Sequence, residues 1–295
     1  MRALVIGGSG FTGRRVLAQA PNNVEVFATA RSPRAHKTVY GLGANPIHAD
    51  LDDPDSVKGA IASVDPDVVI TVASLGFGHT PSLLACIEGC NVARAVFTST
   101  TGIFTALNPP SKAVRLEAER AIQASALDFT IVRPTMIYGR PGDRNMERLL
   151  AFLRRISWVP TPGGGTAYQQ PVHVDDLADV LWASGTGDAF SRDAFNVPGA
   201  SALTFAGVVE TAGAALGRRT RVINVPTKVL RTVIGAQERL LPSPLLKVEQ
   251  IDRLREDKAF APDDARGVLG RDLIAFDEGI RREVLLIQEA AEVQP

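Results

Sequence analysis

The chain has 295 residues, of which 45% are hydrophobic and 22% charged, the balance of a globular protein with a sizeable buried core. Lysine plus arginine and aspartate plus glutamate both total 32, and this zero net charge gives no sign of a nucleic-acid partner. No apolar run approaches the roughly 20 residues that span a bilayer, and the N-terminus shows no secretory signal pattern, so we expect a cytoplasmic protein without stable membrane insertion.

Short apolar segments alternate with helix-like segments through the first half of the chain. The predicted strands are 3–6, 24–28, 47–49, 68–72, 95–97 and 129–132, and the predicted helices are 12–20, 55–62 and 112–125. Runs of this kind are typical of strands that are buried on both faces. Their repeated strand–helix order predicts the α/β class, with a Rossmann-type doubly wound parallel sheet.

The second half of the chain is less regular. Residues 160–165 are rich in proline and glycine and form a candidate hinge, 172–183 indicate a strand end leading into a helix, and 205–216 indicate a further helix. Residues 226–257 contain two helical pieces broken at Pro242 and Pro244. We predict a core domain over 1–160, to which 171–200 return, and a smaller C-terminal lobe over most of 161–295.

The two cysteines, Cys86 and Cys90, are four residues apart and would share one face of a helix. Two thiols with no histidine near them do not form a zinc site, so we expect no metal. We expect both to be buried structural residues in a reducing compartment, because no disulfide framework is implied.

A glycine-rich segment separates the first predicted strand from the first helix. Its residues are Gly7, Gly8, Ser9, Gly10, Phe11, Thr12 and Gly13. Glycine is needed there for a tight turn, for close approach of backbone amides to a pyrophosphate and for close helix–strand packing. The start of the helix adds a partial positive charge. The context predicts a dinucleotide-binding loop.

The end of the second predicted strand indicates which nucleotide binds. An NAD site usually has an acidic residue there for the ribose 2′-hydroxyl, but this chain has Arg31 and no carboxylate. An arginine can form charge-assisted hydrogen bonds to a 2′-phosphate. Arg14, Arg34 and Lys37 are candidates to add positive charge. We therefore expect NADP, with NAD still open.

These features resemble the extended and atypical short-chain dehydrogenase/reductase superfamily, which includes NAD-dependent epimerases/dehydratases and NmrA-like proteins. Further matching segments follow successive strands: Asp50-Leu51, Ala73-Ser74, Ser99-Thr100-Thr101, Pro134-Thr135-Met136 and 171–178. The resemblance implies that Asp50 and Leu51 meet the adenine, that Ala73 and Ser74 lie under the cofactor, and that Pro134, Thr135 and Met136 lie near the nicotinamide. The resemblance covers about 1–180, and the later residues correspond to a variable substrate lobe.

The sequence departs from this superfamily at its usual catalytic pair, a tyrosine followed four residues later by a lysine. Alignment through the helix that follows puts Ser111 at the tyrosine position and Arg115 at the lysine position. A serine hydroxyl cannot replace a phenol, and arginine cannot exchange a proton near neutrality. Lys112, on the same helical face as Arg115, is a candidate acid or ribose ligand. Thr100 matches the hydroxyl that usually orients the substrate.

Other conspicuous residues have structural interpretations. Tyr138 is the one phenol expected near the site, but we expect it to pack, and His173, Asp175 and Asp176 belong to a segment that is mainly a clamp in relatives. Residues 163–165 are either a mobile flap or a connector. The cations among leucines in 226–257 allow a helix on a membrane surface, but a helix covering the substrate pocket is the favoured interpretation.

Two functions stay open. The first is an NADP-dependent oxidoreductase or epimerase/dehydratase-like enzyme that acts on a small molecule, such as a sugar nucleotide or a carbonyl compound. The alternative is a non-catalytic NADP-binding regulatory module of the NmrA-like kind, which the lost tyrosine–lysine pair favours. A homodimer is an expectation by analogy with the superfamily alone.

Overall fold

A seven-stranded parallel sheet organises the first part of the chain in a computed structural model that describes residues 1–187, 190–240 and 248–292. Its strand order is β11-β6-β5-β4-β1-β2-β3. The strands are β1 (Arg2–Ile6), β2 (Glu25–Thr29), β3 (Asn45–Ile47), β4 (Val68–Thr71), β5 (Arg94–Thr98), β6 (Phe129–Pro134) and β11 (Asp193–Val197). The order reverses between β1 and β4, which confirms the predicted doubly wound Rossmann-type fold.

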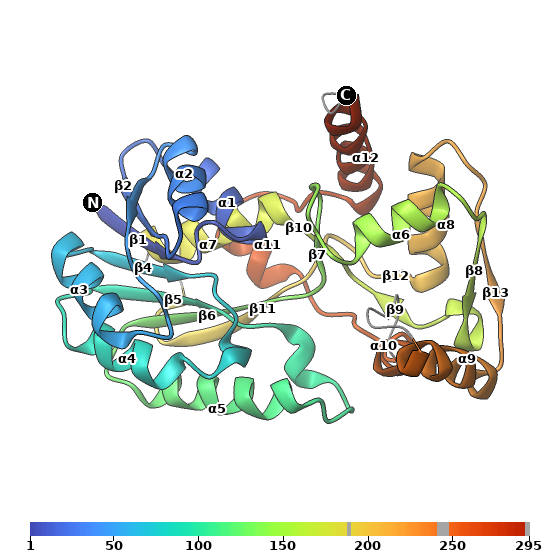
Figure 1. Ribbon diagram of the computed structural model, residues 1–295, viewed down its shortest axis with the longest axis horizontal. Helices are drawn as coiled ribbons and strands as arrows, with labels where there is room; N and C mark the ends of the chain where they lie inside the picture. The colour runs from blue at the N-terminus through green and yellow to red at the C-terminus, as the bar shows by residue number, and fades with distance from the viewer. Residues whose placement is uncertain (188–189, 241–247, 293–295) are drawn as a thin grey trace.

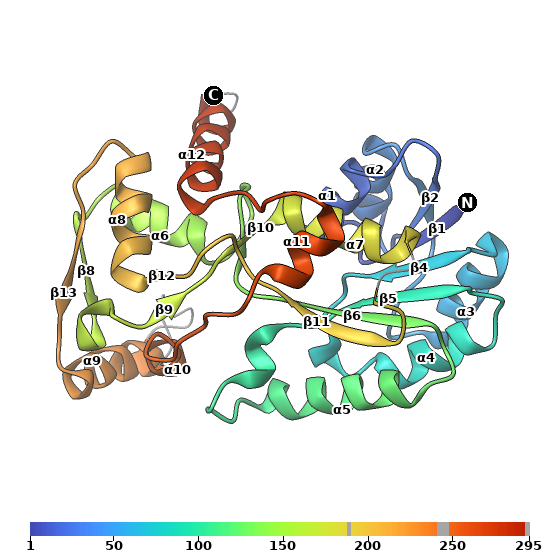
Figure 2. The same ribbon diagram turned by 180° about the vertical axis from the view of Figure 1, so that it is seen from behind.

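Helices cover both faces of this sheet (Figures 1 and 2). One face packs against α1 (Phe11–Ala18), α2 (Pro33–Gly41), α7 (Val174–Thr186) and α11 (Asp263–Leu269). The other packs against α3 (Pro54–Val64), α4 (Thr80–Glu88) and α5 (Pro110–Ala124). Each face has its own buried apolar cluster, so the strands are apolar on both sides, as their sequences indicate.

A smaller lobe lies beyond the carboxyl ends of the strands (Figure 1). Its main apolar cluster joins α6 (Met146–Leu153), α8 (Phe205–Ala215) and α12 (Phe276–Glu292). Three two-stranded ladders complete it: β7 (Ile137–Tyr138) with β10 (Val172–His173), β9 (Tyr168–Gln169) with β12 (Leu203–Thr204), and β8 (Trp158–Thr161) with β13 (Arg221–Asn224). The helices α9 (Thr227–Leu240) and α10 (Val248–Arg253) pack on each other through a fourth cluster.

The structure adds elements that the sequence did not indicate. All six predicted strands and the three predicted helices of the first half are present. The helices α2, α4, α6, α11 and α12 were not predicted, nor were β11 and the short lobe strands β7, β8, β9, β12 and β13. The Pro/Gly-rich residues 160–165 are not a hinge to the lobe, because they end β8 and form a 3₁₀ turn within it, η3 (Pro162–Gly165). Pro242 and Pro244 lie outside the described residues. In the described ranges, no helix combines the length and the apolar character that crossing a membrane requires.

Candidate functional site

The glycine segment forms a tight turn from β1 into α1. Gly7 has a φ of 90°, which favours glycine, and the Gly10 amide donates to the Gly7 carbonyl oxygen at 3.1 Å. A methyl group on Gly13 would lie 2.2 Å from that same oxygen. No side chain caps the first turn of α1 and no acidic residue lies in it, so its amides suit an anion. The backbone is therefore shaped as a phosphate cradle, with Ser9, Phe11 and Thr12 half-buried along it.

An open hollow lies at the end of β2, where we expect the protein to discriminate between NADP and NAD. It is lined by Ala30, Arg31, Ser32, Pro33, His36, Lys37 and His48. The Arg31 side chain is 69% exposed, and its Nη1 lies 3.9 Å from Oδ1 of Asp50. The hollow thus places two permanent cations beside the predicted nucleotide loop, and this arrangement can accept a phosphate group.

Two of the arginines expected to assist Arg31 do not line this hollow. Arg14 lies instead beside Gly142, where an added methyl group would be 3.5 Å from its Nη2. Arg34 is exposed on α2 and is absent from the lining. Of the three basic residues expected to assist Arg31, Lys37 lines the hollow, and support of a 2′-phosphate by Arg14 and Arg34 stays a prediction.

The carboxyl ends of β3 and β4 bring four further candidates to the same edge of the sheet. Asp50 and Leu51 follow β3, and Ala73 and Ser74 follow β4. Leu51 and Ala73 pack, partly buried, against the apolar cluster under α3 and α4. The Ser74 hydroxyl accepts a hydrogen bond from the Gly76 amide at 3.2 Å and so starts the short 3₁₀ turn η1 (Leu75–Phe77).

Three candidates lie at the end of β6, where the chain leaves the sheet for the lobe. Thr135 is buried; its hydroxyl donates to the Gln170 carbonyl at 2.5 Å and its amide donates to the Val197 carbonyl at 3.2 Å. Pro134 is also buried, whereas Met136 is half-buried. Thr135 therefore uses its polar groups to hold the lobe against the sheet, and Met136 is the most exposed of the three.

The four catalytic candidates meet around two 3₁₀ turns, η1 and η2 (Thr101–Phe104). The Thr100 hydroxyl accepts from the Gly102 amide at 3.1 Å. The Arg115 guanidinium donates to the Ser111 hydroxyl at 2.8 Å and lies against Gly76, where a methyl group would be 3.1 Å from it. Lys112 contacts the end of η2, because its ammonium donates to the Thr105 carbonyl at 2.5 Å. Thr100, Ser111 and Arg115 thus lie at the carboxyl ends of β4 and β5.

The structure adds residues from the far end of the sequence to this group. α10 lies near the N-terminal end of α5 (Figures 1 and 2), and the segment after it contacts η2. The Glu256 carboxylate accepts from the Thr105 hydroxyl at 2.6 Å and from the Ala106 amide at 2.8 Å. Arg253 reaches Gly102, where an added methyl group would lie 3.1 Å from its Nη2. No sequence signal links these residues, which are about 150 positions apart.

The side chains of His173, Asp175 and Asp176 join elements outside the candidate site. Asp175 accepts a hydrogen bond from Arg15 of α1 at 2.6 Å, and Asp176 accepts from Arg271 at 2.7 Å. Tyr138 is fully buried and meets the His173 ring edge-on at 5.4 Å between centroids. Burial lowers the pKa of His173 despite the opposing effect of Asp175. These contacts are those of a clamp between sheet and lobe.

A buried acid belongs to the same junction. Glu283 of α12 is fully buried, and its Oε2 accepts from the Gly139 amide at 3.0 Å. Burial, followed by a hydrogen bond with Asp143 and the charge of that residue, raises the pKa of Glu283. The carboxyl is therefore protonated near neutrality, because two adjacent buried carboxylates would repel each other.

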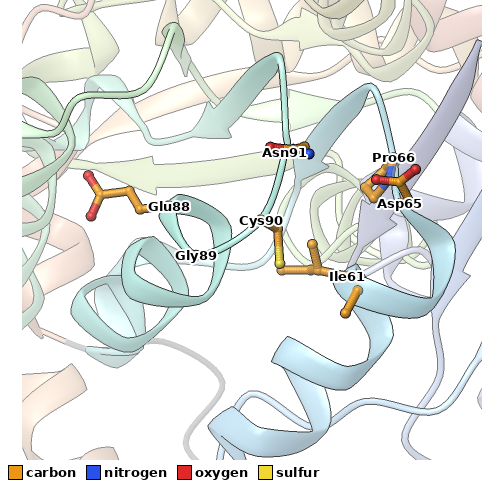
Figure 3. A pocket seen from close by; sticks show the side chains of 8 residues that line it. Ile61, Asp65, Pro66, Glu88, Gly89, Cys90 and Asn91 are labelled. Carbon is orange, nitrogen blue, oxygen red and sulfur yellow. The ribbon is translucent and has the colours of Figure 1, made fainter.

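A second open hollow lies away from the candidate site, between the C-terminal ends of α3 and α4 (Figure 3). Ile61, Asp65, Glu88 and Cys90 are among the residues that line it. Cys86 is buried as expected, and burial raises the pKa of its thiol, but Cys90 is half-buried against this hollow, so the expectation of burial is wrong for it. The described residues contain no group of three or more histidine, cysteine or acidic side chains suited to a metal.

The glycine cradle, the strand order and the residues at the carboxyl ends define a Rossmann-type nucleotide-binding protein. A family model described as NAD(P)H-binding matches residues 7–184, and the chain belongs to this family. This match, together with its relatives, confirms the resemblance to the extended short-chain dehydrogenase/reductases.

Relatives and solved structures agree with this membership. The chain is 26% identical to the mitochondrial NADH dehydrogenase (ubiquinone) 1 alpha subcomplex subunit 9 of Arabidopsis thaliana, over 86% of this chain and 70% of that protein. It is 27% identical to the 4-hydroxy-2-methyl-3-oxo-4-farnesyl-3,4-dihydroquinoline-1-oxide ketoreductase of Stigmatella aurantiaca, over 96% and 91%. The triphenylmethane reductase of Citrobacter sp. has the same fold, with a TM-score of 0.78 at 16% identity over 97% of this chain and 100% of that one.

Proposed function

We propose that the protein is an NADPH-dependent reductase of a small carbonyl compound. The observation that carries the proposal is the hollow after β2, where Arg31 stands at the position that an NAD site gives to an acid and Lys37 adds a second cation. A ketoreductase among the relatives supports the reaction class. The glycine cradle, Asp50, Leu51, Ala73, Ser74 and Met136 are then the residues that hold the nucleotide.

NADPH held at the glycine cradle would supply the hydride for the carbonyl carbon, and uptake of a proton by the carbonyl oxygen would then give an alcohol and NADP⁺. The Thr100 hydroxyl accepts from the Gly102 amide, which leaves its own proton available to a substrate oxygen. Arg115, held by Ser111, supplies positive charge where the oxygen becomes negative. The proton that completes the alcohol comes from solvent water, since arginine does not release one near neutrality.

Lys112 takes a different role in this proposal from the one that its sequence position suggested. Its ammonium already donates to the Thr105 carbonyl, which closes η2 beside Thr100. We therefore assign it to positioning η2, in place of acid catalysis.

The test is to follow the absorbance of NADPH with the purified protein and a panel of aldehydes, ketones and quinones. Oxidation of NADPH that depends on both the protein and a carbonyl compound, with formation of the alcohol, is the expected result. Binding of NADPH without oxidation by any member of the panel would count against the reductase.

A non-catalytic NADPH-binding module is the second candidate. Ser111 and Arg115 replace the tyrosine and lysine that the superfamily normally uses, and this observation favours it. The relative that is an NADH dehydrogenase subunit is compatible with such a role. Calorimetric binding of NADPH in a protein with no turnover would support this candidate.

A further inference from the structure

Two arginine side chains from distant parts of the chain lie against the two 3₁₀ turns that follow β4 and β5. Arg115, on α5, lies against Gly76 at the end of β4. Arg253, at the end of α10, lies against Gly102 in η2. A methyl group built on Gly102 would lie 3.1 Å from Nη2 of Arg253 and 3.3 Å from Oγ1 of Thr100. The second guanidinium therefore flanks the hydroxyl that we assign to the substrate oxygen.

The two guanidinium groups are close enough to affect each other. Burial and, second, the positive charge of Arg253 lower the pKa of Arg115. Arg115 donates to the neutral Ser111 hydroxyl. Among the described residues, no carboxylate forms an ion pair with Arg115. Two guanidinium groups in one region offer N–H donors from two directions to an anionic group.

The lobe holds Arg253 in this position through its neighbours. The Lys258 ammonium donates to the Arg253 carbonyl at 2.8 Å and to Oε1 of Gln169 at 3.3 Å, which ties the end of α10 to β9. Glu256 uses its carboxylate to bind η2. Each guanidinium has five N–H donors, so Arg253 can accept a ligand in addition to any partner within the chain.

We propose that Arg115 and Arg253 form a binding site for an anionic group of the substrate, a carboxylate or a phosphate, next to the carbonyl that Thr100 orients. That the bound anion belongs to a substrate rests on the proposed reductase function, whereas the anion site itself does not. The planar guanidinium fork matches carboxylate and phosphate oxygens in pairs, which gives orientation as well as affinity. The anionic group is unchanged in the reaction and fixes which face of the carbonyl receives the hydride.

The first experiment measures anion binding without turnover. The protein saturated with NADP⁺ is titrated calorimetrically with oxamate, a carboxylate probe, and with inorganic phosphate. We compare the wild type with Arg253→Gln, and use Arg255→Gln as the matched control, because Arg255 is exposed in the same segment. We expect Arg253→Gln to weaken binding of one of the two probes about tenfold or more, with NADP⁺ affinity retained and Arg255→Gln unaffected.

The second experiment measures turnover with matched substrates. A 2-oxo acid is compared with its methyl ester, and dihydroxyacetone phosphate with dihydroxyacetone, which separates a carboxylate from a phosphate requirement. We expect the anionic member of one pair to have the lower KM, and Arg253→Gln to remove that advantage more than it lowers kcat. Arg253→Lys should restore part of it, since a point charge replaces the fork.

The two proposals fail in different ways. Anion binding that depends on Arg253 without any oxidation of NADPH would overturn the reductase and keep the anion site. Reduction of neutral and anionic carbonyl compounds alike, with no effect of Arg253→Gln, would keep the reductase and overturn the anion site. Absence of oxamate and phosphate binding to the wild type would also overturn it.

Discussion

Arg31 offers the sharpest test of how the protein chooses its nucleotide. Replacement of Arg31 by alanine removes the one guanidinium that lines the hollow after β2. It leaves the Asp50 carboxylate, whose Oδ1 is 3.9 Å from Arg31 Nη1, beside the position of the lost group. A 2′-phosphate would then face a carboxylate, whereas the 2′-hydroxyl of NADH could donate to it. We expect the variant to lose NADPH affinity and to keep or gain NADH affinity.

The size of the effect follows from the exposure of Arg31. A hydrogen bond to a charged partner contributes about 1.5–3 kcal/mol. Because 69% of the Arg31 side chain is exposed, solvent screens its charge, and we expect a contribution at the lower end of this range. Loss of about 1.5 kcal/mol raises the Kd for NADPH roughly tenfold. Added salt should reduce the difference between wild type and variant, since exposed charges are screened.

The assay is calorimetric titration of NADPH and NADH into wild type, Arg31→Ala and Arg34→Ala. Arg34 is the matched control, because it is an exposed arginine that does not line the hollow. Equal weakening of NADPH binding in both variants would refute the assignment, since it would reflect general charge. Equal loss of NADH and NADPH binding in Arg31→Ala would also refute it, because the 2′-phosphate would then not be what Arg31 contacts.

Three further substitutions test the rest of the site and its support. Gly13→Ala places a methyl group 2.2 Å from the Gly7 carbonyl oxygen, so we expect loss of nucleotide binding and about 1–3 kcal/mol of stability by chemical denaturation, whereas Gly59→Ala, with nothing within 4 Å, should be neutral or stabilising. Glu283 has a raised pKa, so its contribution to stability is present below about 4.5 and is lost as pH rises toward its folded pKa. Between pH 5 and 8 we expect the free energy of unfolding of the wild type to fall by about 1.4 kcal/mol per pH unit because of this group, and the Glu283→Gln variant to lack that fall. Thermal unfolding measures both, and parallel pH dependences of wild type and variant would contradict a protonated buried acid. Lys112→Met should lower kcat without moving the pH profile if Lys112 positions η2, and loss of a basic limb from the profile would show it to be the acid instead.

Most of the sheet could be predicted because six of its seven strands carry their own signal. Runs such as Val68–Thr71 are apolar without interruption, and glycine or proline separates them from helices, so local pattern and global fold agree. The helix α2 was missed although its start has the expected signals: Ser32 accepts from the Ala35 amide, and Pro33 follows it. Its exposed face is polar and its buried residues are few, which weakens the periodic pattern.

The sequence could place the residues at the strand ends that we expect to hold the nucleotide, but it could not place the lobe residues that lie near them. The residues placed at the strand ends are close to one another because parallel strands deliver their carboxyl ends to one edge. Arg253, Glu256 and Lys258 reach that edge through a contact that spans about 150 residues, and nothing in their local sequence marks it. Contacts of this kind depend on how the lobe packs, which neighbouring residues do not encode.

The replacement of the superfamily lysine by Arg115 is consistent with what the lobe brings to it. A lysine at that position can lower the pKa of a tyrosine, but with Ser111 in place of the tyrosine there is no phenol to activate. Arg115 keeps its charge, and the lobe adds Arg253 beside it. The segment that carries Arg253 is anchored to β9 by Lys258 and to η2 by Glu256. Selectivity for an anionic substrate would then depend on how these two anchors set the distance between the guanidinium groups, so changes in the lobe would alter the substrate without altering the nucleotide.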